Sequence, residues 1–452
     1  MSRTNKRWMK WMGASLTALT ITAVVVACGG GSNDVETQAA TNTTPVAPVT
    51  PPDPPVTRSE TGAQRVKHVF VITLENKSYA DTFGSSEQDP YLQKTLPSMG
   101  ALFTQYFGTG HASLTNYIAM ISGQPVTPET TGDCTIYADF VQTGTTADGL
   151  PIGTGCVFPA SVKTLPDQLK AKGLTWRGYM EDMGNDPTRE NVTCGHPVLG
   201  TTDQTNKQLA PSAAVPKGDQ YASRHNPFVY FHSIIDSSDC DTNVVALDKL
   251  EAALASIEST PNFTFITPNV CNDGHDGDGT GVGAADGSHR CADGNPGGLT
   301  QIDTFLKIWV PKIMESAAFK KDGLLIINFD ENAASGMVVS TDGAGKTHYT
   351  VNFGDEACCN QPAGPNVTYP YTQTFPISTT AQYDLVFPAQ GGGRTGAVMI
   401  SPFIKAGTVV DTPHNHYSLL RSIEQIFDLP EYLGYANQAD LASFATPEVF
   451  AN

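Results

Sequence analysis

Five short and almost uninterrupted apolar runs constrain the fold of this chain more than any other feature. They are VKHVFVITL (66–74), LTWRGYM (174–180), NFTFITP (262–268), GLLIINFD (323–330) and GAVMISPFI (396–404). A strand with one exposed face alternates apolar and polar residues, whereas a continuous apolar run indicates a strand that is covered on both faces. The sequence therefore predicts a sheet that lies between two layers of other elements.

Segments with helical periodicity lie between these apolar runs. They are TLPDQLKAKG (164–173), VVALDKLEAALASI (244–257), LTQIDTFLKIWVPKIMESAAF (299–319) and HYSLLRSIEQIFDL (416–429). Strands that alternate with helices are typical of βαβ connections, which join parallel strands. We therefore expect an α/β fold, a three-layer sandwich with a largely parallel central sheet. In such a sheet, ligands bind beyond the carboxyl ends of the strands.

The first 28 residues resemble an export signal. Four basic side chains precede the apolar stretch GASLTALTITAVVVAC (13–28), which is too short to span a bilayer comfortably. Its end, VVAC, resembles the bacterial lipobox, in which the cysteine is lipidated and becomes the new N-terminus. We expect residues 1–28 to be a lipoprotein-type signal peptide and Cys28 to anchor an exported bacterial protein in the cell envelope, at the outer membrane or in the periplasm. Cleavage by the ordinary signal peptidase, which would give a soluble periplasmic or secreted protein, is the alternative.

Residues 29–63 are rich in Gly, Thr and Pro and contain almost no large apolar side chains. Such a segment cannot bury enough surface to fold, so we expect a disordered tether. The remainder, 64–452, contains no second linker and no internal repeat, and it is therefore predicted to be one large domain. Its Gly-rich stretches 273–298 and 387–396 are predicted to be long loops, which in folded domains are usually functional or mobile.

The chain is acidic, with a formal net charge of −18 at pH 7. Nucleic acid and anionic membrane surfaces are not expected as partners, because they would repel this charge. The membrane would be reached only through the lipid on Cys28. An anionic substrate would need locally concentrated positive charge from a metal, histidines or arginines.

Eight cysteines remain when Cys28 is set aside. They are Cys134, Cys156, Cys194, Cys240, Cys271, Cys291, Cys358 and Cys359. An even number of cysteines in an exported chain indicates disulfide bonds, although the sequence leaves their pairing open. Adjacent cysteines do not pair easily with each other, so we expect Cys358 and Cys359 to connect one loop to two others.

Two of the predicted strands end in a pair of polar residues. Glu75 and Asn76 follow the first run, and Asp330 and Glu331 follow the run at 323. A single carboxylate after a buried strand is often a helix cap or a loop acid, but two such pairs in one sheet offer several oxygen ligands at the same edge. Oxygen ligands suit Mg²⁺, Ca²⁺ or Mn²⁺ better than zinc in a soft-ligand site. Without a cation, four such groups together would repel and be poorly solvated.

The segment GTGHASLTNYIAMISG (108–123) combines a glycine run with the start of an apolar helix. Ser113 lies where the helix would begin, so capping is its structural explanation. The same position also directs backbone N–H groups towards an anion and suits a nucleophilic hydroxyl that attacks a phosphate. Asn116 could then donate to a phosphoryl oxygen, and His111 could contact the substrate.

The loop PNVCNDGHDGDGTG (268–281) follows the third strand and contains His275 beside Asp276. A lone histidine is more often structural. A histidine next to aspartates at the carboxyl end of a strand is a candidate for phosphate binding or for general acid catalysis.

Five segments together resemble a known family. In chain order, VITLENKSYADTFG, HASLTNYIAMISGQ, NVCNDGHDG, LLIINFDE and NHYSLLRSIEQIFDLPEYLG are similar to the phosphoesterase family of bacterial non-specific phospholipases C and acid phosphatases, within the alkaline phosphatase-like superfamily. The resemblance covers about residues 64–436 and implies an alkaline phosphatase-like fold. It also implies that one catalytic metal is bound by Glu75, Asn76, Ser113, Asp330 and Glu331.

The resemblance further implies roles in catalysis and substrate binding. Ser113 matches the nucleophile of the family, and His275 matches its phosphate-contacting histidine. His225, in SRHNPFVYF, also recurs in the family pattern and is expected to bind substrate together with His111, Asn116 and Asp276. This chain has Ala112 and Thr115 where prolines are common, which leaves the geometry of the loop around Ser113 open.

By this resemblance the protein is expected to be a metal-dependent phosphoric ester hydrolase. We expect an acid phosphatase that cleaves phosphate monoesters through a phosphoserine intermediate on Ser113, with one divalent ion (Mg, Ca or Mn) as its cofactor. The acidic chain and the HAS form of the nucleophile segment favour monoesters over the alternative, a phospholipase C that cleaves phospholipid head groups. A non-catalytic surface lipoprotein is the alternative from another class.

Overall fold

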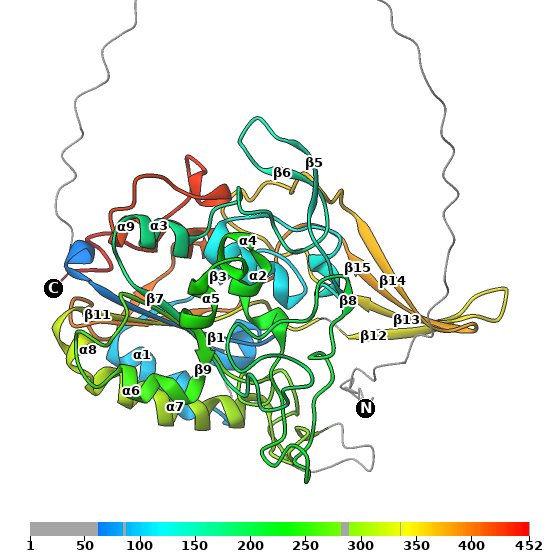
Figure 1. The fold of residues 1–452 in the computed structure, drawn as a ribbon, viewed down its shortest axis with the longest axis horizontal. Coiled ribbons are helices and arrows are strands. Elements are labelled where there is room, and N and C mark those ends of the chain that lie inside the picture. The colour runs from blue at the N-terminus through cyan, green and yellow to red at the C-terminus, as the bar shows by residue number, and fades with distance from the viewer. Residues whose placement is uncertain (1–61, 85–86, 282–288, 335, 452) are drawn as a thin grey trace, which may run out of the picture. The chain divides into compact units, whose positions relative to one another are not determined.

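The five apolar runs form five neighbouring strands of an eight-stranded central sheet (Figure 1). The computed structural model describes residues 62–84, 87–281, 289–334 and 336–451. Among these residues the strand order is β17-β2-β16-β11-β1-β10-β7-β9. The strands are β1 (His68–Leu74), β2 (Ala101–Phe103), β7 (Trp176–Met180), β9 (Val244–Ala246), β10 (Phe263–Thr267), β11 (Gly323–Phe329), β16 (Ala397–Ile400) and β17 (Thr408–Val410). The predicted buried sheet is confirmed.

The centre of this sheet is parallel. Strand β1 pairs in parallel with β10 and β11, and β7 pairs in parallel with β10 and β9. Strand β16 is antiparallel to β11 and β2, so the sheet is mixed on that side. The carboxyl ends of β11, β1, β10 and β7 consequently meet at one edge, which is where an open α/β sheet binds its ligands.

Helices cover both faces of the sheet, as Figure 1 shows. Val69 and Val71 of β1 belong to the same apolar cluster as residues of α2 and α9, whereas Phe70 and Ile72 share a cluster with α7 and α8. All seven residues of β1 are buried, which explains its continuous apolar sequence. The helices are α1 (Leu96–Met99), α2 (Ser113–Ser122), α3 (Leu165–Ala171), α4 (His232–Ile235), α5 (Ser238–Asn243), α6 (Leu250–Ala253), α7 (Gly298–Glu315), α8 (Ala317–Asp322) and α9 (His416–Ile426). The α/β three-layer prediction is confirmed.

Two of the four predicted helices form close to their expected limits. Helix α3 begins with a capping box between Thr164 and Asp167, and the Asn415 side chain caps α9 by accepting from the Ser418 amide. The helix predicted over 244–257 is wrong at its start, because 244–246 pair with β7 as the edge strand β9. The helix predicted over 299–319 divides into α7 and α8 at Ser316, which caps the second helix.

A second, smaller sheet was not predicted. It has the order β12-β13-β15-β14 and projects from the side of the main sheet in Figure 1. Its strands are β12 (Met337–Thr341), β13 (Thr347–Asn352), β14 (Tyr371–Ser378) and β15 (Ala381–Phe387). Strands β14 and β12 are largely exposed, so they lack the apolar runs that identified the central strands. Short two-stranded pairs complete the fold: β3 (Tyr106–Phe107) with β18 (His414–Asn415), β4 (Ile136–Tyr137) with β8 (Thr201–Thr202), and β5 (Val141–Thr145) with β6 (Pro151–Thr154).

The eight cysteines form four disulfide bonds. The pairs are Cys134–Cys156, Cys194–Cys240, Cys271–Cys291 and Cys358–Cys359. The prediction that Cys358 and Cys359 would bind to separate loops is therefore wrong. The backbone accommodates the bond between neighbours with Cys359 in the left-handed region, at φ 65°.

Described structure begins at Gly62, where the 3-10 helix Gly62–Arg65 buries Ala63. Ala63 joins the apolar cluster that contains Val69, and the domain boundary at 64 stays a prediction. The predicted signal peptide, Cys28 and the tether up to residue 61 lie outside the described residues. Within the described ranges, every helix is too short or too polar to cross a membrane.

Candidate active site

The two polar pairs meet at the carboxyl edge of the sheet. Leu74 and Phe329 are partners in the parallel register of β1 and β11, so the next residues of both strands emerge side by side. The Asn76 amide N–H donates to Oδ1 of Asp330 at 3.2 Å, and Asn76 Nδ2 donates to Oε1 of Glu331 at 3.3 Å. The structure therefore brings Glu75, Asn76, Asp330 and Glu331 together, as the sequence predicts.

Ser113 contacts the first of these pairs directly and the second only through the N–H of the residue before it. It is the first residue of α2, and its hydroxyl donates to Oε2 of Glu75 at 2.8 Å. The preceding residue, Ala112, has φ 78°, and its N–H donates to Oε1 of Glu331 at 3.0 Å. A left-handed alanine is unfavourable by itself and persists only where the surroundings hold it. Ser113 consequently faces the carboxylates instead of capping the helix.

The side chains at this edge fit a hard divalent cation. Glu75 Oε1, Asn76 Oδ1 and Asp330 Oδ2 are buried and accept no hydrogen bond from the described residues. Burial raises the pKa of Glu75, and the charge of Asp330 raises it further. The pKa of Asp330 is raised in the same way, by burial and by Glu331. Buried carboxylates without a counter-charge are costly, and a cation with oxygen ligands would satisfy all three atoms.

Glu331 also holds the histidine of the nucleophile segment. Its Oε2 contacts Nδ1 of His111, whose ring stacks on Phe353 with centroids 4.6 Å apart. Burial lowers the pKa of His111 to about 4, so the ring is neutral at physiological pH. Both oxygens of Glu331 thus already have partners within the protein. The oxygens of Glu75, Asn76 and Asp330 that accept no hydrogen bond are more available as metal ligands. Contact between His111 and a substrate stays a prediction.

Asn116 has a different role from the predicted one. Its Oδ1 accepts from the N–H groups of Thr109 (2.8 Å) and Gly110 (3.1 Å), while its Nδ2 donates to the carbonyls of Gly110 (2.8 Å) and Ala112 (3.4 Å). Both ends of the amide are occupied, so it cannot also donate to a phosphoryl oxygen. We correct the prediction: Asn116 braces the loop that leads to Ser113.

His225 lies beside Glu75 and beside an aspartate that sequence reasoning missed. Its Nε2 is 3.3 Å from Oε1 of Glu75, and its Nδ1 is 3.1 Å from Oδ2 of Asp273. The ring stacks on Tyr117 of α2, with centroids 5.2 Å apart and planes 5° apart. Glu75, His225 and Asp273 could themselves hold a metal ion, since one ligand atom from each lies within 4.8 Å of the others. Asp273 follows β10 at the same edge, which was the available signal.

His275 is held next to this group. Its N–H donates to Oδ1 of Asp273 at 2.8 Å, and its Nδ1 lies 2.9 Å from Oδ1 of Asp276. Its ring centroid is 6.2 Å from that of His225. The structure thus gathers both predicted histidines, and it shows Asp276 as a partner of His275. Binding of substrate by Asp276 stays a prediction.

Two buried basic residues near the site were not identified from the sequence. Lys77 directly follows Asn76, and its Nζ donates to the Gly274 carbonyl at 2.7 Å. Burial lowers the pKa of Lys77, while Asp273 and other nearby carboxylates counteract this effect. Arg224 precedes His225 and donates to Oδ1 of Asn206 at 2.7 Å. These positive charges offset part of the negative charge at the site.

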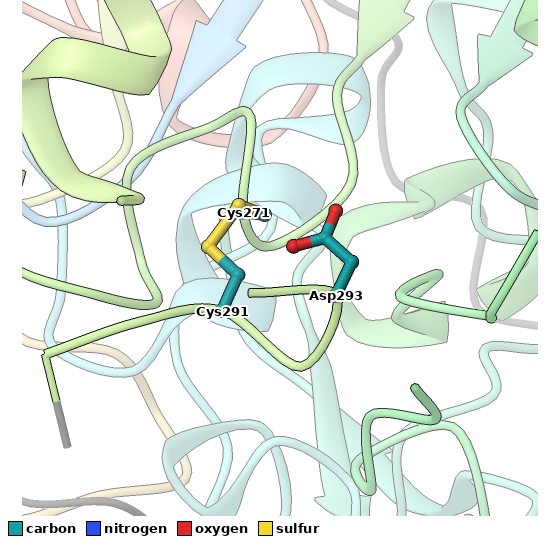
Figure 2. Close-up of side chains that lie close together, drawn as sticks. All are labelled: Cys271, Cys291 and Asp293. Atoms are coloured by element: carbon teal, nitrogen blue, oxygen red, sulfur yellow. A yellow bond between two sulfur atoms is a disulfide. The ribbon is translucent and has the colours of Figure 1, made fainter. Parts of the chain in front are cut away.

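Figure 2 shows a further group that resembles a metal site, formed by Cys271, Cys291 and Asp293. The two sulfur atoms are bonded to each other as a disulfide, so they are not available as thiolate ligands. The bond closes the loop that contains His275. It therefore stabilises the position of this histidine instead of binding a metal.

Comparisons with known proteins give one family model and several relatives of low sequence identity. Residues 85–430 match the model described as "Phosphoesterase family". A probable acid phosphatase of Kluyveromyces lactis is 22% identical over 416 residues, which cover 91% of this chain and 69% of that protein. An acid phosphatase of Aspergillus fumigatus is 24% identical over 263 residues, 58% of this chain and 44% of that protein.

Two further matches are a curated relative and a solved structure. A phosphatidylinositol-3-phosphatase of Mycobacterium tuberculosis is 24% identical over 210 residues, 46% of this chain and 52% of that protein. The chain thus spans about half the length of this relative and of the Aspergillus protein. A crystal structure of a protein in the alkaline phosphatase superfamily from Vibrio parahaemolyticus covers 81% of this chain and 67% of its own, with 14% identity and a TM-score of 0.40. Since the family match extends over most of the described residues, the chain belongs to the phosphoesterase family.

Proposed function

We propose that the protein is a phosphoric ester hydrolase that releases phosphate from monoesters through a phosphoserine on Ser113. One observation carries this proposal: the Ser113 hydroxyl donates to one oxygen of Glu75, whose other oxygen is buried without a hydrogen bond at the carboxyl edge of the sheet. A serine at the start of a helix and beside buried carboxylates is well placed to attack phosphorus. Membership of the phosphoesterase family supports the same reaction class.

Glu75, Asn76 and Asp330, together with Ser113, would hold one divalent cation, and Glu331 lies beside them as a further ligand. The oxygens of Glu75, Asn76 and Asp330 that accept no hydrogen bond support this ligand set. When bound, the cation would lower the pKa of the serine hydroxyl and offset charge on a nonbridging phosphate oxygen. The choice among Mg²⁺, Ca²⁺ and Mn²⁺ is left to experiment, because all three accept oxygen ligands.

The chain's own residues would orient the reaction. Glu75 fixes the direction of the Ser113 hydroxyl, and Asn116 and Glu331 hold the backbone on either side of Ala112. His275 and His225 would stabilise the equatorial oxygens of the phosphoryl group by hydrogen bonding, His225 as a neutral ring because burial and the charge of Arg224 lower its pKa.

We propose monoesters, not phospholipids, as substrates. The K. lactis and A. fumigatus relatives, whose names include acid phosphatase, support this choice, as does the net charge of −18, which disfavours an anionic membrane surface. The four disulfides support an exported protein, since such bonds persist in oxidising compartments. Anchoring through lipid on Cys28 in a bacterial envelope remains a proposal.

Metal analysis coupled to activity tests this function. The purified protein is assayed with p-nitrophenyl phosphate before and after chelation, and again after addition of Mg²⁺, Ca²⁺ or Mn²⁺. We expect about one equivalent of metal per chain, loss of phosphate release on chelation and recovery with one of the ions. Diglyceride release from phosphatidylcholine without phosphate release from soluble monoesters would instead indicate a phospholipase C. Absence of both activities in the metal-loaded protein would indicate the non-catalytic alternative.

A further inference from the structure

Residues 353–361, here called the strap, contact the nucleophile loop at two points. At the start of the strap, the Phe353 ring stacks on His111 with centroids 4.6 Å apart and planes 23° apart. At its end, Nε2 of Gln361 donates to the Thr109 carbonyl at 2.6 Å. His111 and Thr109 lie two and four positions before Ser113. The strap therefore contacts the side chain of His111 and the backbone of Thr109, just before Ser113.

Each end of the strap also contacts a residue outside the nucleophile segment. Phe353 also stacks on Phe387 of β15, with centroids 4.8 Å apart, and its N–H donates to the Val386 carbonyl at 3.0 Å. The Gln361 carbonyl accepts from Nε2 of Gln390 at 3.1 Å. A change in the conformation of the strap between these contacts would therefore be transmitted to the nucleophile loop.

The Cys358–Cys359 disulfide lies between the two contacts and fixes the local backbone. Cys359 and Asn360 have φ values of 65° and 52°, and the Gln361 N–H donates to the Cys358 carbonyl at 3.2 Å. A disulfide stabilises a protein mainly by closing a loop in the unfolded chain, and the other three bonds span 22, 46 and 20 residues. The Cys358–Cys359 bond spans one residue and closes almost no loop. Its effect is consequently local, on the shape of the strap.

This disulfide is also the most accessible of the four in the described chain. Cys358 and Cys359 are partly exposed, whereas the six other bonded cysteines are at most 7% exposed. Exchange with an external thiol requires access to a sulfur atom. A dithiol would reduce this bond first: it gives up two electrons and two protons, the Cys358–Cys359 bond breaks to two thiols, and the dithiol closes to its own disulfide.

We propose that Phe353 and Gln361 are positioning residues for Ser113, and that the Cys358–Cys359 disulfide is a redox-sensitive clasp that keeps them in place. In the oxidised protein the strap holds His111 and Thr109, and the nucleophile loop is ordered for reaction. Reduction releases the left-handed turn at Cys359, so the contact of Gln361 with Thr109 is lost and turnover falls. This inference rests on the proposed hydrolysis at Ser113.

The test compares kcat and KM of the metal-loaded enzyme on p-nitrophenyl phosphate with and without a mild dithiol. We expect kcat to fall about 10-fold or more while KM changes less than about 2-fold, because the loop that orients the nucleophile is displaced. Removal of the dithiol and air oxidation should restore kcat. A Cys358→Ser/Cys359→Ser variant should have the lowered kcat without reductant and should not respond to dithiol. Gln361→Met, which removes the donor to Thr109, should reproduce the same fall.

Hydrogen exchange separates this inference from the proposed function. Reduction, or the double serine variant, should accelerate exchange of the Thr109 and Gly110 amides, which donate to Asn116 in the folded chain. If exchange becomes faster in a protein that has no phosphatase activity, the positioning role of the strap is supported and the proposed function is rejected. If the double serine variant has the kcat of the wild type and unchanged exchange, the proposed positioning role of the strap is wrong.

Discussion

The Ser113 hydroxyl and the Glu75 carboxylate are joined by a 2.8 Å hydrogen bond across the carboxyl edge of the central sheet. The two residues are 38 positions apart in the chain, and both are buried, with exposed fractions of 3% and 0%. A hydrogen bond inside a buried site is shielded from water and fixes the direction of the hydroxyl. This pair links the proposed nucleophile to the proposed cation ligands.

Ser113→Ala should reduce kcat on p-nitrophenyl phosphate by at least about 10³-fold, because it removes the attacking oxygen. Steady-state kinetics on the metal-loaded variant provide the measurement. Ser122→Ala is a matched control, because Ser122 is buried on the same helix but donates to the Ile118 carbonyl within it. Near-normal turnover in the Ser113 variant would contradict the proposal that a phosphoserine forms at this residue.

Much of the scaffold could be predicted because its determinants are local. The apolar runs identified β1 and β11, and the parallel pairing of Leu74 with Phe329 brings the residues after them together. The smaller sheet could not be predicted in this way. Its strand β14 alternates between partly and fully exposed residues and therefore carries little apolar signal.

The direction in which a side chain points was harder to predict than which residues lie at the site. Asn116 was predicted to face a phosphate because it lies one helical turn from Ser113, but the left-handed Ala112 folds the loop back over the amide. The position of Asp273 after β10 was a sequence signal for this edge, but the burial of Asp273 and of Lys77 near Glu75 could not be read from the sequence.

Asn116→Ala should lower the free energy of unfolding by about 2–4 kcal/mol, because it leaves buried backbone groups of the nucleophile loop without partners. Urea denaturation measures this change. The affinity for inorganic phosphate, measured by competitive inhibition, should stay within about 3-fold if enough folded protein remains, since the amide is fully used within the loop. Weaker phosphate binding with unchanged stability would support the original role in substrate binding.

Gly392→Ala should destabilise the protein by about 1–3 kcal/mol, because there is no space for a methyl group. A Cβ at this position would lie 2.4 Å from the Gly110 carbonyl oxygen and 2.8 Å from Gly108. The triple glycine thus permits close approach of the two loops. Gly343→Ala is the control, because a Cβ there meets no atom within 4 Å. Equal thermal unfolding temperatures for the two variants would contradict this explanation.

Glu424→Gln should make the stability of the protein less dependent on pH. Glu424 is 0% exposed on α9, its Oε1 accepts from the Leu433 N–H at 2.9 Å, and burial raises its pKa to about 9. A carboxyl group whose pKa is higher in the folded than in the unfolded chain stabilises the fold below the unfolded value, about 4.3, and this stability is lost as pH rises towards 9. Glutamine keeps the acceptor for Leu433 but cannot ionise.

The free energy of unfolding of the wild type and of Glu424→Gln should therefore be compared by urea denaturation between pH 5 and pH 9. We expect the variant to gain stability relative to the wild type with each step in pH, since only the wild type must keep a carboxyl group protonated to remain folded. Glu315→Gln, a change at an exposed glutamate that ends α7, is the matched control. Parallel stability curves for the wild type and Glu424→Gln would show that Glu424 ionises as readily in the folded as in the unfolded chain, so that its burial has no effect on its protonation.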